Sequence, residues 1–200
     1  MKLRARTAWL VFALLCTWLH APLAATQNQT PAAAIGTTNV AVVAWCNKEA
    51  GTIEAATFNG AWSLSATTIS SGNGNAFHPL VAVDNLSGNA AVVWIETDPA
   101  TQKYAVYGTF YTNYSTSFPF TGPFHWVSPM QLSISGHDVM PEDLAIAINT
   151  AHPASTNVNV IVTWSEYVNG DRGISAIYGI VKTSPASIAP SWTLPSLPGP

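Results

Sequence analysis

Three short apolar runs recur along the chain and give the first indication of its fold. They span Val40–Trp45, Ala90–Ile95 and Val158–Trp164. Each run is rich in β-branched residues and too short for a helix, so each is predicted to be a strand buried on both faces. Glycine and proline recur throughout the chain and interrupt any helical pattern. The pattern therefore predicts an all-β protein.

Around each run the same succession of segments returns. A first strand precedes the run, a second alternating segment follows it, and a tryptophan opens a fourth segment. Because repeats of this kind determine the architecture, we divide the chain into three copies of four strands each. The copies cover about residues 31–70, 79–135 and 141–197.

The connections between strands carry turn signals. Asp84–Asn89 joins the first two strands of the second copy, and its Asp and Asn side chains suit bonds to the backbone, while Gly88 suits a positive φ. Asn169–Asp171 supplies a tight turn in the third copy. These turns predict antiparallel hairpins in series.

Six tryptophans fall into two sets with matching places in the copies. Trp45, Trp94 and Trp164 end the second strands, and Trp62, Trp126 and Trp192 open the fourth strands. Because each copy must bury an equivalent face against its neighbour, we interpret these residues as anchors that pack one copy on the next.

The amino-acid sequence of the second copy resembles that of a known protein family. Pro79-x-Val-Ala-Val-Asp84, Gly88-Asn-Ala-Ala-Val-Val-Trp94, Tyr104-Ala-Val-Tyr107 and Trp126 are similar to the blades of bacterial secreted β-propeller repeat proteins, largely of undefined function. The resemblance covers essentially the whole chain after its N-terminal segment and carries no catalytic residues. It implies three four-stranded antiparallel propeller-like blades.

Three blades are fewer than the four or more of a closed propeller. We therefore favour an incomplete propeller arc. Two alternatives stay open: a homo-oligomer that completes the ring, and an irregular sandwich. The chain is then either a working scaffold or a fragment of a larger propeller.

The N-terminus predicts export. Residues 1–25 contain a basic start, an apolar stretch from Ala8 to Leu19 and small residues up to Ala25, which is typical of a signal peptide. Residues 26–200 form the repeat region. The expected location is the exterior, the periplasm or the cell surface, and no integral membrane segment is expected after signal removal.

The charge of the chain after the signal limits the classes of partner that it is expected to bind. Beyond the signal only four lysine and arginine residues remain against ten acids, which argues against nucleic acid and anionic membranes. Cys46 is then a lone cysteine, and its place in a strand pattern predicts a buried thiol.

The ionisable residues suggest structural roles. Glu96 and Glu166 each follow a matching tryptophan by two residues, which favours a shared role at a strand end over a glycosidase carboxylate pair. His137–Asp138 and Glu142–Asp143 match no metal-ligand spacing and are interpreted as a solvated loop between blades. We predict no metal, no cofactor and no catalytic residue.

Any function is then expected in the unmatched loops, Thr112–Phe124 and Thr150–Asn157. The first loop region offers a ligand-binding hypothesis that rests on four side chains: Tyr111, Tyr114, Phe124 and His125. Because a rigid scaffold with variable loops suits binding, we expect a secreted non-enzymatic repeat protein that contacts a protein or a glycan. The alternatives are a propeller enzyme of the glycoside hydrolase type and a non-functional fragment.

Overall fold

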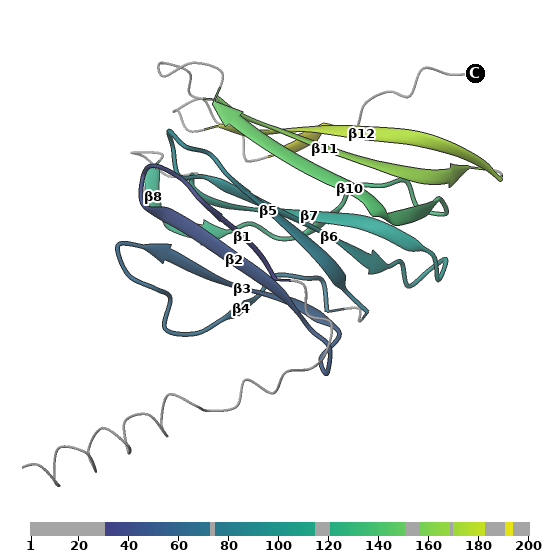
Figure 1. The fold of residues 1–200 in the computed structure, drawn as a ribbon, viewed down its shortest axis with the longest axis horizontal. Helices are drawn as coiled ribbons and strands as arrows, with labels where there is room; N and C mark the ends of the chain where they lie inside the picture. Colours follow the sequence, from purple (N-terminus) through teal and green to yellow (C-terminus); the bar gives the residue numbers. More distant parts are fainter. Residues whose placement is uncertain are drawn as a thin grey trace, which may run out of the picture.

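The protein folds into three antiparallel β-sheets (Figure 1). The computed structural model describes residues 31–72, 75–114, 121–150, 157–168, 170–182 and 191–193, and these contain no helix. The predicted all-β class is confirmed. The predicted signal peptide lies outside the described residues.

Each sheet is a meander in which the strands follow one another in chain order. Sheet A contains β1 (Ala32–Ile35), β2 (Val40–Asn47), β3 (Thr52–Asn59) and β4 (Thr67–Thr68). Sheet B contains β5 (Phe77–Val83), β6 (Ala90–Thr97), β7 (Tyr104–Tyr114), β8 (Thr121–Trp126) and the short β9 (Met130–Gln131), which pairs with β7. Sheet C contains β10 (Asp138–Thr150), β11 (Asn157–Val168), β12 (Asp171–Lys182) and β13 (Ser191–Thr193).

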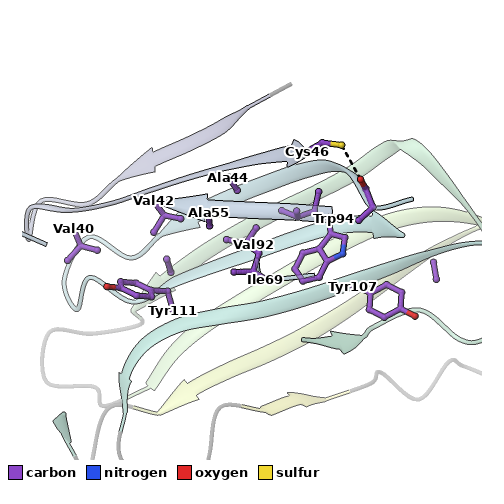
Figure 2. Packing of buried hydrophobic residues seen from close by; sticks show 14 residues of the cluster. Val40, Val42, Ala44, Cys46, Ala55, Ile69, Val92, Trp94, Tyr107 and Tyr111 are labelled. Atoms are coloured by element: carbon purple, nitrogen blue, oxygen red, sulfur yellow. Dashed lines mark hydrogen bonds between the residues drawn. The ribbon is translucent and has the colours of Figure 1, made fainter. Parts of the chain in front are cut away.

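The sheets pack face to face, with sheet B between the other two (Figure 1). One core cluster joins sheets A and B and includes Val42, Ala44, Val92 and Trp94, which Figure 2 shows. A second cluster joins sheets B and C through residues such as Val93 and Val160. Because successive side chains of a strand point to opposite faces, the all-apolar run of β6 supplies both clusters.

Two prolines coincide with irregular strand pairing. Pro79 lies in β5 where the register with β6 shifts between Phe77 and Leu80, and Pro141 lies in β10 where the register shifts between Met140 and Ala145. Proline has no N–H to donate to a ladder, so it is tolerated at such bulges. His78 accordingly adopts a positive φ of 54°.

Two loop predictions need correction. Thr112–Phe124 is not one long loop, because β7 continues to Tyr114 and β8 begins at Thr121. The cluster of Asp138, Glu142 and Asp143 is not a loop either, since all three lie in β10. Threonine and aromatic residues favour extended backbone and lengthen β7, while the bulge lets β10 run past Pro141.

The turn predictions agree with the structure. Residues 85–87 form a turn, and Gly88 has a φ of 73°. Gly170, with a φ of 92°, lies between β11 and β12. Within the described residues, no helix is long and apolar enough to cross a membrane.

Candidate functional site

Two buried carboxylates bind the tryptophans that precede them by two residues. Trp94 Nε1 donates to Glu96 Oε2 at 2.9 Å, and Trp164 Nε1 donates to Glu166 Oε2 at 2.8 Å. Residues two apart in a strand share a face, so the Trp-x-Glu spacing alone brings the two groups together. Both carboxylates are almost completely buried.

The second oxygen of each carboxylate is also occupied. Glu96 Oε1 accepts a hydrogen bond from Ser71 Oγ. Glu166 Oε1 accepts one from Ser175 Oγ at 2.6 Å and lies 3.0 Å from His137 Nδ1. Burial raises the pKa of Glu166, but the hydrogen bonds from Ser175, Trp164 and His137 outweigh it, so the pKa lies below its usual value. These carboxylates are therefore held as structural acceptors.

In sheet A the carboxylate that accepts the indole N–H comes from a different strand. Asn47 stands where the other sheets have glutamate, and the indole of Trp45 instead donates to Glu54 Oε2 of β3 at 3.2 Å. Asn47 Nδ2 donates to Glu54 Oε1 at 2.7 Å. Glu54 lies directly opposite Trp45 in the register, as Ser175 lies opposite Trp164.

Sheet A therefore has Asn47 and Glu54 where sheet C has Glu166 and Ser175. This difference predicts that two substitutions in sheet A compensate each other. Asn47→Glu crowds two carboxylates, and Glu54→Ser removes the indole's acceptor, so each single change is expected to destabilise the fold by about 1 kcal/mol. The double variant recreates the arrangement of Glu166 and Ser175 and is expected to regain most of that loss. Urea unfolding of all four proteins gives the coupling free energy. Simple addition of the two single effects would contradict the exchange.

At the opposite end of the strands, the turn after β5 contacts both neighbouring sheets. The buried carboxylate of Asp84 accepts bonds from the backbone N–H of Thr150 at 2.9 Å and from its hydroxyl at 2.7 Å, which ties sheet B to sheet C. On the other side, a Cβ at Gly88 would lie 2.8 Å from Val40 of sheet A. This turn is a junction of all three sheets.

An open cavity of about 320 Å³ lies between sheets A and B at the strand end that carries Cys46. This volume lies at the lower end of the roughly 300–1,000 Å³ found for small-molecule sites. Its described lining contains no carboxylate and consists of Cys46, Lys48, Gly51, Asn75, Ala76, Phe77, Thr97 and Tyr104. It is a candidate binding site in the described part of the chain.

Aromatic rings form one wall of this cavity. Tyr104 and Phe77 pack edge to face, with ring centroids 5.2 Å apart, and Tyr104 is 43% exposed. The backbone N–H of Tyr104 donates to Asp138 Oδ1 of sheet C at 3.3 Å. The ring therefore projects from a backbone that a neighbouring sheet holds in place, with one part available to a ligand.

Cys46 is one of the residues that line the cavity. Its thiol is buried and donates to the carbonyl of Ala76 at 3.2 Å, the contact drawn in Figure 2. Burial raises the pKa of the thiol, against a smaller opposing effect of Lys48. The thiol is thus buried, as the strand pattern predicted.

The predicted aromatic ligand site is placed at the other strand end and is largely internal. Tyr111 is buried and stacks on Phe124 at 5.1 Å and against Trp126 at 5.0 Å. His125 is exposed, and strand alternation places it on the face opposite Phe124. The side chain of Tyr114 lies outside the described residues.

The six tryptophans occupy equivalent register positions but differ in exposure. Trp94 and Trp164 are buried in the two cores, and Trp126 and Trp192 are half-buried against them. Trp192 stacks on Phe110 of sheet B at 4.4 Å. Trp45 is half-buried, while Trp62 is 54% exposed and contacts Phe58. The two tryptophans of sheet A thus lack the burial of their counterparts.

Sheet C carries a further ion pair, outside the buried carboxylates. Arg172 donates to Asp143, and the described residues hold no group of three or more His, Cys, Asp or Glu side chains arranged for a metal. The cavity lies outside the matched positions of the copies, because Asn75 and Phe77 precede the second copy and Lys48 and Gly51 lie in a turn of the first.

The chain was also compared with known proteins. No protein-family model matches it, and neither a curated protein nor a solved structure does.

Proposed function

We propose that this chain is an exported, non-enzymatic repeat protein that binds a saccharide in the cavity between sheets A and B. The three stacked meanders, with tryptophans at equivalent register positions, support a β-propeller arc as its architecture. The basic and apolar N-terminal segment supports export.

The observation that carries the proposal is the composition of the cavity wall. The exposed part of Tyr104 offers apolar surface for the flat side of a sugar ring. Asn75 and Thr97 offer amide and hydroxyl groups that suit sugar hydroxyls. A mostly apolar cavity with a few polar groups is the usual form of a small-ligand site.

The carboxylates support binding rather than hydrolysis. A glycosidase needs two carboxyl groups that face the sugar, one of them able to give up a proton. Glu96 and Glu166 are buried and hydrogen-bonded on both oxygens, and the described lining of the cavity offers no carboxylate. The scaffold therefore suits recognition without turnover.

Loss of the exposed ring is expected to abolish binding. Tyr104→Ala should lower saccharide affinity at least tenfold, because the stacking surface disappears while the strand remains. Tyr167→Ala is the control, since Tyr167 is also 43% exposed but lies in β11 of sheet C and does not line the cavity.

A glycan array, followed by calorimetry on any saccharide retained, measures both variants. Retention of a saccharide by the wild type and by Tyr167→Ala, but not by Tyr104→Ala, would support the proposal. Equal loss in both variants, or no retention of any saccharide, would overturn it. Release of reducing sugar from a bound saccharide would favour the enzyme alternative instead.

A further inference from the structure

The three sheets are stacked in the same orientation, so each internal interface joins unlike faces of two neighbouring sheets. We call the side of each sheet that bears Trp45, Trp94 or Trp164 its tryptophan face, and the other side its reverse face. In the register these tryptophans lie opposite Glu54, Tyr107 and Ser175, respectively, so the three positions are equivalent.

Both internal interfaces join a tryptophan face to a reverse face. The tryptophan face of sheet B, with Val92 and Trp94, packs on the reverse face of sheet A, with Val42 and Ala44. The tryptophan face of sheet C, with Val162 and Trp164, packs on the reverse face of sheet B, with Val93. The same pair of surfaces is therefore used twice.

The tryptophan face of sheet A has no partner sheet among the described residues. Ile35 pairs with Ala41 and shares this face with Trp45, because cross-strand partners project to the same side. Ile35 is 71% exposed, and Trp62, which pairs with Phe58 on this face, is 54% exposed. In sheet B the counterparts of Ile35 and Trp62 are Val83 and Trp126, which are half-buried against the core. Val92 and Trp94 of sheet B are fully buried, whereas their counterparts in sheet A, Val43 and Trp45, are half-buried.

Within the part of the chain that the structure describes, the reverse face of sheet C has no partner sheet either. Ile174 lies opposite Ser165, the position that Ile53 and Val106 occupy in the other sheets, opposite Cys46 and Ile95. Ile174 is 82% exposed, whereas Ile53 and Val106 are fully buried.

A second position on this face behaves alike. Ile161 corresponds to Val42 and Ala91, and it is 47% exposed although both counterparts are fully buried. The two isoleucines are apolar at positions where the other sheets bury apolar residues against the next sheet. An exposed apolar surface of this kind marks an interaction site.

We propose that the reverse face of sheet C binds the tryptophan face of sheet A in a second copy of this chain. The second copy is the occupant because each open face already has its counterpart within the chain, in the A–B and B–C interfaces. The contact is head to tail, since it joins two different faces. It involves surfaces away from the cavity and stands independently of saccharide binding.

A head-to-tail contact between copies of a chain produces either a closed ring or an open-ended assembly. Two copies that each contribute three sheets close into a ring of six when the rotation between copies suits it, and otherwise the copies extend into an open chain. The Arg172–Asp143 ion pair lies at one end of the open face of sheet C and gives this surface a polar rim.

The test uses one charge on each open face. Ile174→Asp changes only sheet C, and Ile35→Asp changes only sheet A; both side chains are exposed, so both variants should fold. Leu86→Asp is the matched control, because Leu86 is 53% exposed in the turn after β5, outside both faces. Light scattering across a range of concentrations measures the mass of each purified protein, and circular dichroism verifies folding.

The expected pattern is specific to a head-to-tail contact. The wild type and Leu86→Asp should form dimers or larger assemblies, and each of the other two variants alone should be a monomer. An equimolar mixture of Ile174→Asp and Ile35→Asp should regain a dimer, because one intact face remains on each variant.

Three results would overturn the proposal. The wild type could remain a monomer at every concentration. One variant could assemble alone while the other does not, which indicates contact between like faces. The mixture could also fail to associate although both variants are folded and the wild type assembles.

Discussion

Replacement of Asp84 by alanine is expected to destabilise the protein by about 3 kcal/mol. The Asp84 carboxylate is buried and accepts hydrogen bonds from the backbone and hydroxyl of Thr150 and from the backbone and hydroxyl of Ser87. Without it the buried N–H groups lose their acceptor, and each unsatisfied buried group costs about 1–3 kcal/mol. The loss is expected to loosen sheet C from sheet B.

Urea unfolding measures this effect. The control is Asp171→Ala, because Asp171 is exposed at the start of β12 and its loss should change the free energy of unfolding by less than about 0.5 kcal/mol. A stability of Asp84→Ala within that margin would show that the junction does not hold the sheets together.

The same carboxylate gives an acid-sensitive contribution. Burial raises the pKa of Asp84, but the hydrogen bonds from Ser87 and Thr150 outweigh it and place the pKa below its usual value. A lowered native pKa adds stability above the unfolded pKa, about 3.9 for aspartate, and this stability is lost as the pH falls through the native pKa. Between pH 5 and pH 2 we therefore expect a smaller loss of stability in Asp84→Ala than in Asp171→Ala.

Replacement of Glu166 by alanine is the second large effect, with an expected loss of about 3 kcal/mol. The indole of Trp164, the hydroxyl of Ser175 and the ring of His137 all meet this carboxylate in a buried position. Its removal leaves donors without acceptors and a void beside the indole. The effect is expected mainly in sheet C.

Thermal unfolding and near-ultraviolet circular dichroism follow this loss and the environment of Trp164. Glu142→Ala is the control, since Glu142 is exposed on β10 of the same sheet. The lowered pKa of Glu166 adds stability that is present above the unfolded value of about 4.3 and lost at lower pH. Equal melting temperatures for the two variants would contradict a structural role for this carboxylate.

Local patterns predict the three central strands and several contacts. The prediction that a tryptophan opens each fourth strand is wrong, because Trp126 ends β8 and Trp62 lies before β4 in an isolated bridge. The β-branched runs predicted β2, β6 and β11 as strands. Of these, β6 is buried on both faces as predicted, whereas β2 is half-buried on one face and Ile161 of β11 is 47% exposed. The Asp-Asn and Gly signals predicted the turn after β5, because their conformational preferences operate over a few residues. The link between Trp94 and Glu96 also follows from strand geometry alone, since a separation of two places both side chains on one face.

Other features depend on residues far apart in the chain. The partner of Asp84 is Thr150, 66 residues away, and no local pattern joins them. Sheet A takes its carboxylate from Glu54 because the register of β2 with β3 places that residue opposite Trp45. The cavity likewise needs Cys46, Asn75 and Tyr104 from three different segments.

The sequence alone therefore determined the all-β class and the order of the strands. It also determined which residues of each tryptophan-bearing strand share a face, because all of these depend on short-range spacing. Tertiary structure decided which equivalent residues are buried. Ile53, Val106 and Ile174 share one position, yet the first two are covered by the next sheet and the third is exposed. Whether an apolar residue is buried depends on the neighbouring sheet. An apolar pattern therefore indicates that a strand needs a partner surface but does not identify that surface.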